Sequence, residues 1–182
     1  MKSFLKTIVE TIQIFLIALA IVVPVRYFLF QPVFVNGASM EPNFVSGDYI
    51  LVNEISFRFN DPARGEVIIF KNPQDKSHYF IKRIIGLPGE TIEIKNKKIK
   101  IYNTEFPGGK IIEEDYIIDE ETEGNLRVLL KEEEYFVLGD NRGHSSDSRN
   151  WGSVPRNNII GKAWISISSS VGVSVIPSVL YK

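Results

Sequence analysis

The sequence predicts a mostly β fold: an antiparallel β-sheet domain carried on a single N-terminal transmembrane helix. The densest apolar block lies at residues 8–30, whereas residues 31–182 contain short apolar or alternating runs separated by turn-forming residues. No stretch after residue 31 shows a helical period over ten or more residues. Helix and sheet therefore occupy separate parts of the chain.

Residues 7–30 are predicted to form the transmembrane anchor, after a short cytoplasmic tail at residues 1–6. Between Ile14 and Val25 the chain carries no charged side chain. With its flanks this run is roughly 20 residues long, which at about 1.5 Å per residue crosses a hydrocarbon layer of ~30 Å.

The charges around the anchor predict its orientation. Lys2 and Lys6 precede it and Arg26 lies at its end, and the more basic side of such a helix stays in the cytoplasm. Residues 31–182 are then an extracytoplasmic domain on a plasma membrane, with lipid as a partner. Two alternatives stay open: a cleaved signal peptide ending at residues 18–20 (Ala-Leu-Ala), and a buried helix of a soluble protein.

Short apolar runs beyond the anchor predict strands, and two of them alternate with period two about Asn96-Lys97, which indicates a hairpin. Residues 113–123 hold seven acidic side chains and no basic one, and we expect a solvent-facing excursion without the spacing of a calcium loop. The Ser-rich tail predicts a strand and a loose end. The predicted strands are residues 49–52, 67–70, 91–95, 98–102, 135–138 and 163–167.

The composition excludes several classes of protein. Of 182 residues, 44% are hydrophobic and 24% charged, which is typical of a globular protein. Lys and Arg number 21 against 22 Asp and Glu, so no overall basic field attracts nucleic acid. The chain has no cysteine and two histidines, too few for a dedicated zinc site. We therefore expect no nucleic acid, no metal and no cofactor, which leaves a non-metal enzyme or a binding module.

Two segments carry a candidate nucleophile and a candidate base. Ser39 lies among small residues just before Pro42, a context typical of a constrained turn. Lys82 lies inside a further predicted strand, flanked by apolar residues, and if its side chain points to the apolar face, burial lowers its pKa from about 10.4. Arg83 then faces the opposite way, solvated or paired. The alternatives are an ordinary loop serine and a lysine that extends its amine to solvent.

A third segment, residues 139–152, is dense in side chains that form hydrogen bonds and has glycine at both ends. Asp, Asn, Ser and Gly also form plain turns. A loop of this length and polarity on a β scaffold, however, usually carries function. We therefore group it with the other two segments as a candidate site.

Together the three segments resemble the sequence boxes of the type I signal peptidase (leader peptidase) family, from the anchor to about residue 163. The resemblance implies a membrane-bound serine endopeptidase with a Ser/Lys dyad. Such an enzyme removes N-terminal signal peptides, with small residues at the positions one and three before the cut, from exported preproteins. The matching residues are Ser39-Met40-x-Pro42, Lys82-Arg83-x-x-Gly86-x-Pro88-Gly89 and Gly139-Asp140-Asn141-Arg142-x-x-Ser145-x-Asp147-Ser148-Arg149.

The resemblance also implies a role for each matching position. Ser39 is the nucleophile, Lys82 the general base, and the Ser39 backbone N–H an oxyanion donor. Ser145 orients the lysine amine. Some family members carry a second hydroxyl at the position held here by glycine, so the second oxyanion donor stays open. The residues expected to support the site are Gly37, Met40, Ser145, Asp140, Arg142 and the ion pair of Asp147 with Arg149.

Three rival interpretations remain. A Ser-His-Asp hydrolase would use Ser39 and His144. The self-cleaving SOS repressor family shares the Val-x-Gly-x-Ser-Met pattern of residues 35–40, but it would require a DNA-binding helix-turn-helix upstream, where only the apolar anchor is found. A membrane-tethered β module without activity would not depend on either Ser39 or Lys82.

Overall fold

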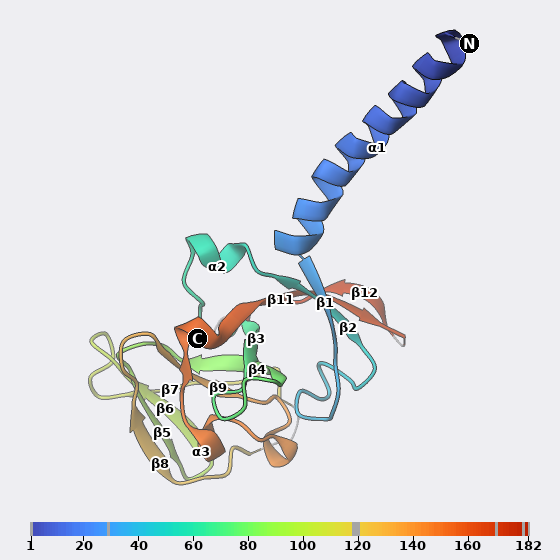
Figure 1. Cartoon of the computed structure of the whole chain (residues 1–182). Helices are drawn as coiled ribbons and strands as arrows, with labels where there is room; N and C mark the ends of the chain where they lie inside the picture. The colour runs from blue at the N-terminus through green and yellow to red at the C-terminus, as the bar shows by residue number, and fades with distance from the viewer. Residues whose placement is uncertain (1, 29, 118–120, 170, 180, 182) are drawn as a thin grey trace.

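The N-terminal helix α1 (Lys2–Phe28) extends away from the β domain that holds the rest of the chain (Figure 1). Its window Lys6–Val23 has a mean hydropathy of 2.0 and is 0% buried, so α1 is long and apolar enough to cross a membrane. Exposed apolar side chains along α1 contradict the buried helix of a soluble protein. The computed structural model describes residues 2–28, 30–117, 121–169, 171–179 and 181.

The ends of α1 differ from those of the expected anchor at residues 7–30. The helix already begins at Lys2, because residues 2–6 contain no glycine or proline that would break it. At the other end Phe30 opens strand β1 (Phe30–Phe34), and residue 29 lies outside the described residues. The chain therefore passes almost directly from the apolar helix into the first strand.

The larger sheet contains eight antiparallel strands in the order β1-β2-β11-β3-β4-β9-β10, with β12 paired to β11. Neighbouring strands are thus close in sequence in the pairs β1-β2, β3-β4 and β9-β10 and far apart in the pairs β2-β11, β11-β3 and β4-β9. After β1 its strands are β2 (Tyr49–Asn53), β3 (Val67–Lys71), β4 (Tyr79–Gly86), β9 (Glu134–Leu138), β10 (Val154–Pro155), β11 (Ile159–Ser168) and β12 (Gly172–Val175).

The smaller sheet contains four strands in the order β7-β6-β5-β8. The predicted hairpin is confirmed, with Lys95 opposite Lys98 and with Asn96 and Lys97 at φ 52° and 63°, the left-handed backbone that a two-residue hairpin turn requires. The strands of this sheet are β5 (Thr91–Lys95), β6 (Lys98–Tyr102), β7 (Lys110–Ile111) and β8 (Leu126–Leu129).

The predicted mostly β, antiparallel class is confirmed, and every predicted strand is present in the sheets. The strands that sequence patterns did not predict are β1, β7, β8 and β10. β7 and β10 have only two residues each, and Pro32 interrupts the pattern of β1, which is an edge strand where proline is tolerated. The helical turns beyond α1 are α2 (Ser56–Phe59), η1 (Arg142–His144), α3 (Ser148–Trp151) and η2 (Arg156–Asn158).

Three clusters of buried apolar side chains hold the domain together. One lies under β1, β2 and β3, one between the two sheets, and one beneath β3, β4 and β9. Buried apolar side chains on β9 and at the end of β4 thus fix the strand from which the loop after β9 begins. Representative members are Met40, Phe44 and Val52; Ile92, Leu130 and Phe136; and Phe70, Ile84 and Val137.

The acidic segment, residues 113–123, faces solvent only in part, and residues 118–120 lie outside the described residues. Glu113, Glu121 and Glu123 are exposed, as expected. Glu114 and Thr122 instead turn inward: the Glu114 side chain is 12% exposed and Thr122 is 3% exposed. The expectation of a solvent-facing excursion is therefore wrong for these two residues, because a buried arginine attracts them.

Candidate active site

The central part of β4 is buried on both faces, so its two consecutive basic residues are removed from solvent in opposite directions. Lys82 is 4% and Arg83 is 3% exposed, and Lys82 pairs across the ladder with Ile68 of β3. The lysine that would extend its amine to solvent is thereby excluded. Because side chains alternate along a strand, Lys82 and Arg83 reach different partners.

Ser39 lies in the turn region between β1 and β2, and the residue after it fixes that turn to the core. Met40 is 1% exposed within the first apolar cluster, and its carbonyl accepts a hydrogen bond from the Phe44 N–H at 2.9 Å. Gly37 precedes the serine at φ +97°, a left-handed conformation that glycine adopts without strain. Gly37 and Met40 thus shape the turn from either side of the serine.

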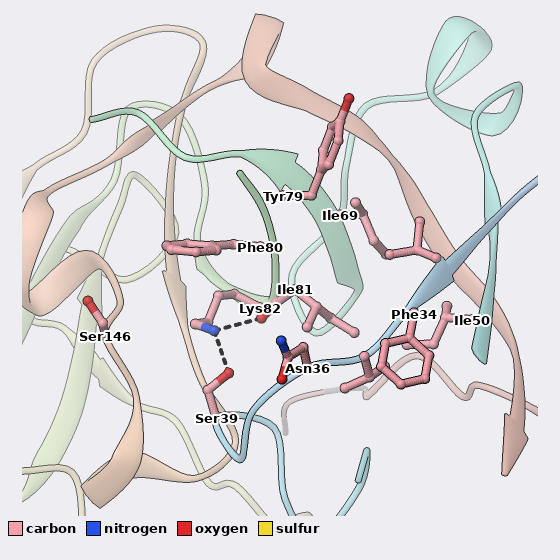
Figure 2. Close-up of a pocket in the computed structure, with 12 residues that line it drawn as sticks. Phe34, Asn36, Ser39, Ile50, Ile69, Tyr79, Phe80, Ile81, Lys82 and Ser146 are labelled. Carbon is pink, nitrogen blue, oxygen red and sulfur yellow. Dashed lines mark hydrogen bonds between the residues drawn. The ribbon is translucent and has the colours of Figure 1, made fainter. Parts of the chain in front are cut away.

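The Lys82 amine lies beside the Ser39 hydroxyl. Nζ is 2.7 Å from Ser39 Oγ, within hydrogen-bond distance, and donates to the Ile81 carbonyl oxygen at 2.8 Å (Figure 2). The Phe80 ring centroid lies 5.6 Å from Nζ. A neutral amine held in this way gives one hydrogen to Ile81 and turns its lone pair toward the serine O–H.

Burial makes the neutral amine accessible near physiological pH. Loss of hydration lowers the pKa of Lys82 from 10.5 to about 8. The Asp147 and Asp140 carboxylates oppose this change because they favour the ammonium form. The balance leaves a base that titrates close to neutrality, as a general base requires.

The loop after β9 is closed by a ring of hydrogen bonds. The Gly139 N–H donates to Asp147 Oδ2 at 3.1 Å, and the Arg149 guanidinium donates to both oxygens of Asp147 at 2.8 and 2.9 Å. Arg149 also donates to the Arg142 carbonyl at 2.7 Å, and Arg142 Nε returns to the Gly139 carbonyl at 2.9 Å. The expected pairing of Asp147 with Arg149 is present and forms one side of this ring.

The two other supporting residues do not pair with each other. Asp140 accepts two hydrogen bonds from Arg83 at 2.9 and 2.6 Å and a third from Asn43 at 2.9 Å. Arg142 instead forms a two-pronged ion pair with Glu114, at 2.6 Å for each prong. Sequence reasoning missed Asn43 and Glu114, since neither belongs to the three segments.

Ser145 does not make the contact expected of it. Its Oγ is buried and has no hydrogen-bond partner among the described residues, so the amine of Lys82 is oriented here by the Ile81 carbonyl. The hydroxyl does lie close to the site. A Cβ added at Gly139 would be 2.2 Å from Ser145 Oγ and 2.4 Å from the Ser39 carbonyl oxygen, so these two oxygens border the same small space.

A pocket of about 220 Å³ opens beside the serine and lysine. Its walls are mainly apolar and come from the end of β1, from β2, β3 and β4. Figure 2 shows Ser39 and Lys82 among the lining residues, with Ser146 on one side and Phe34 and Ile50 on the other. An extended peptide can therefore lie against β4 with small side chains directed inward. The lining residues are Val33, Phe34, Val35, Asn36, Ser39, Ile50, Ile69, Tyr79, Phe80, Ile81, Lys82 and Ser146.

The histidine-based rival does not fit this geometry. His144 is exposed and its Nδ1 lies 3.2 Å from the Asn141 side-chain oxygen, whereas Ser39 Oγ contacts Lys82. Among the described residues, no group of three His, Cys, Asp or Glu side chains is placed to hold a metal ion. The arrangement fits a serine nucleophile with a lysine base.

Comparison with known proteins identifies the family of the chain. The family model described as "Signal peptidase, peptidase S26" matches residues 8–167. The chain is 34% identical to a probable signal peptidase I-1 of Synechocystis sp. over 161 residues, covering 85% of this chain and 79% of that protein. It is 36% identical to a signal peptidase I P of Bacillus subtilis subsp. natto over 165 residues, covering 85% of each chain.

A signal peptidase I of Bacillus amyloliquefaciens is 38% identical over 157 residues, covering 80% of this chain and 78% of that protein. A solved signal peptidase I from Enterococcus faecalis V583 aligns with a TM-score of 0.48 at 31% identity, covering 57% of this chain and 97% of that one. The family match extends from the apolar helix into β11. It therefore includes the N-terminal region where the repressor interpretation would require a DNA-binding helix-turn-helix, and that interpretation is excluded. This chain belongs to the peptidase S26 family of signal peptidases.

Proposed function

We propose that this chain removes signal peptides from preproteins by means of a Ser39 nucleophile and a Lys82 general base. The observation that carries the proposal is the 2.7 Å separation of Lys82 Nζ and Ser39 Oγ, in a site where the amine is buried. The family relationship supports the reaction class, and the geometry supports the assignment of residues.

The reaction proceeds by proton transfers between these two side chains. Lys82 takes the hydroxyl proton as Ser39 Oγ attacks the scissile carbonyl, which forms a tetrahedral intermediate. The ammonium then protonates the leaving amine, and an acyl-enzyme remains on Ser39. A water molecule, deprotonated by Lys82, hydrolyses this ester and regenerates both groups. Such acid–base catalysis contributes roughly 10² to 10⁴ in rate.

The oxyanion needs hydrogen-bond donors that are not already used. The Ser39 backbone N–H has no hydrogen-bond partner among the described residues, so it serves as one donor. Removing one donor of this kind costs about 2.7–4 kcal/mol of transition-state stabilisation. The space beside Gly37 is open, since a Cβ there would meet nothing within 4 Å.

Substrate choice follows from the pocket beside the dyad. Its modest volume of about 220 Å³ and its apolar walls favour small side chains at the positions one and three before the cut. The substrate lies extended beside the first half of β4, since β9 pairs with residues 83–86 of that strand; there backbone hydrogen bonds supply affinity and alternate side chains supply specificity. Exported preproteins with small residues before the cleavage point meet both requirements.

The protein functions as a single-pass plasma-membrane enzyme with its N-terminus in the cytoplasm. Residues 7–30 anchor it, residues 1–6 form the tail and residues 31–182 the extracytoplasmic domain. An exposed apolar row across the larger sheet supports contact with lipid, since a contiguous exposed apolar patch marks an interaction surface. This row consists of Phe34, Tyr49, Ile167 and Val173, which pair in register on β1, β2, β11 and β12 and are 55%, 52%, 40% and 72% exposed.

The test is cleavage of a preprotein by the full chain in detergent. Wild type and His144→Ala are expected to release the signal peptide, whereas Ser39→Ala and Lys82→Met are not. Activity in Lys82→Met would contradict the proposed base, and inactivity of wild type across detergents and pH values would contradict the proposed reaction. Loss of cleavage in His144→Ala alone would favour a Ser-His mechanism.

A further inference from the structure

A buried ion pair is among the contacts that join the acidic segment to the loop of residues 139–149. Both carboxylate oxygens of Glu114 accept hydrogen bonds from Arg142, at 2.6 Å each, and the Arg142 side chain is 0% exposed. The two residues lie 28 positions apart. A guanidinium removed from water needs such a partner, because an uncompensated buried charge is strongly unfavourable.

The same segment also contacts the second buried arginine. The Tyr116 hydroxyl donates a hydrogen bond to Glu114, and the Arg83 guanidinium lies 4.2 Å from the Tyr116 ring centroid. Tyr116 and Tyr181 share a further hydrogen bond at 2.8 Å. Tyr116, from the same segment, therefore holds the Glu114 side chain in place, and Glu114 in turn fixes the position of Arg142.

Arg142 belongs to the hydrogen-bond ring that closes the loop of residues 139–149. From this loop the Asn141 N–H donates to the Ser39 carbonyl oxygen at 3.1 Å, and Gly139 lies against the same oxygen. The loop thus supports the backbone of the nucleophile directly. It also carries Asp147, whose carboxylate acts on the charge of the lysine amine.

We propose that Glu114 is a positioning residue for signal-peptide cleavage, which holds the loop of residues 139–149 against Ser39 through its ion pair with Arg142. This inference rests on the function proposed above. It gives the acidic segment a role in the reaction although none of its described side chains lines the pocket beside the dyad. The ion pair depends on both the negative charge of Glu114 and its two carboxylate oxygens, each of which accepts a hydrogen bond from Arg142.

The experiment compares Glu114→Gln with Glu113→Gln in the full chain, in detergent, with a preprotein substrate. Glu113 is exposed and adjacent, so its variant makes the same chemical change without touching the loop. We expect Glu114→Gln to lower kcat by about tenfold or more, since a misplacement of ~1 Å caused from outside the chemistry can cost about 100-fold. Glu113→Gln is expected to match wild type.

The pH profile separates positioning from a simple loss of folded enzyme. The charged groups that act on Lys82 are Asp147 and Asp140, both on the loop, and Asp140 is itself paired with Arg83 from β4. When the loop moves away, the ammonium of Lys82 loses the support of Asp147 and the amine also loses some of the burial that disfavours the charge, so the acid limb of kcat/KM moves from its wild-type position. Partial unfolding lowers the rate without moving that limb.

A double variant guards against a folding defect. The double variant Glu114→Gln, Arg142→Gln removes both charges of this pair, so no partner is left buried and uncompensated, but the ion pair is also lost. We expect kcat to stay as low as in Glu114→Gln. Restoration of wild-type kcat in the double variant would overturn the inference, as would a Glu114→Gln enzyme with wild-type kcat and acid limb. If wild type itself fails to cleave, it is the proposed function that fails.

Discussion

Arg83 and Asp140 form a buried, two-pronged ion pair directly behind the dyad. The side chains are 4% and 0% exposed, and the guanidinium donates to both carboxylate oxygens at 2.9 and 2.6 Å. Arg83 follows Lys82 on β4 and Asp140 begins the loop after β9. The pair therefore fixes the relative position of the strand that carries the base and the loop that supports the nucleophile.

Neutralising one partner is expected to destabilise the fold. Asp140→Asn leaves Arg83 charged and buried, and breaking such a pair costs about 3–5 kcal/mol in free energy of unfolding. The exposed pair of Arg127 with Glu93, 3.8 Å apart, supplies a control, since Arg127→Gln is expected to cost under about 1 kcal/mol. Denaturant titration measures both. Equal losses in the two variants would contradict the structural role of Asp140.

The pH dependence of cleavage is expected to follow the Lys82 amine. The neutral form is the base, so kcat/KM rises with pH through an acid limb centred at about 8, well below the ordinary 10.5 of lysine. Initial rates measured from pH 6 to 10 give this midpoint. A limb centred near 10 would show that the amine is solvated in the working enzyme.

Gly139→Ala is expected to abolish most activity. The added Cβ would lie 2.4 Å from the Ser39 carbonyl oxygen and 2.2 Å from Ser145 Oγ, so the loop and the nucleophile must separate. We expect kcat to fall about 100-fold. Gly143→Ala is the matched control, since a Cβ there meets nothing within 4 Å. Comparable rates for the two variants would argue against close contact between loop and serine.

Lipid contact can be tested by single-cysteine labelling, because the natural chain contains no cysteine. A polarity-sensitive dye on Val173→Cys is expected to shift its emission to the blue when the full chain is reconstituted in vesicles. Lys98→Cys is the control, since Lys98 is exposed on β6 in the small sheet, away from α1 (Figure 1). The same emission at both positions would contradict lipid contact by the apolar row.

Local patterns predicted most of the architecture. Alternation about Asn96-Lys97 predicted the hairpin, since a polar and apolar period of two identifies a half-buried strand whatever it packs against. Sequence patterns did not predict β1, because Pro32 breaks its alternation and its strand character depends on pairing with β2. The apolar residues around Lys82 indicated a possible buried lysine but left an amine that reaches solvent open, and only the structure, with Lys82 4% exposed, decides between the two.

Partners distant in sequence could not be predicted in this way. Arg83 was expected to be solvated or paired, but nothing local identifies Asp140, which lies 57 positions away. Glu114 stood in an acidic run typical of a solvated loop, and only the fold brings it to Arg142. Ser145 was assigned from the family pattern, while the structure turns Lys82 toward the Ile81 carbonyl instead.

The short link between α1 and Ser39 limits how far the nucleophile can lie from the end of the helix. After the helix ends at Phe28, the chain enters the five residues of β1, which span about 16 Å at ~3.3 Å per residue, and the nucleophile follows in the next turn. With so little slack, and with α1 as the proposed membrane anchor, the hydroxyl would work at a set height above the bilayer. Peptide bonds much farther from the lipid than this height stay beyond its reach, whatever side chains flank them.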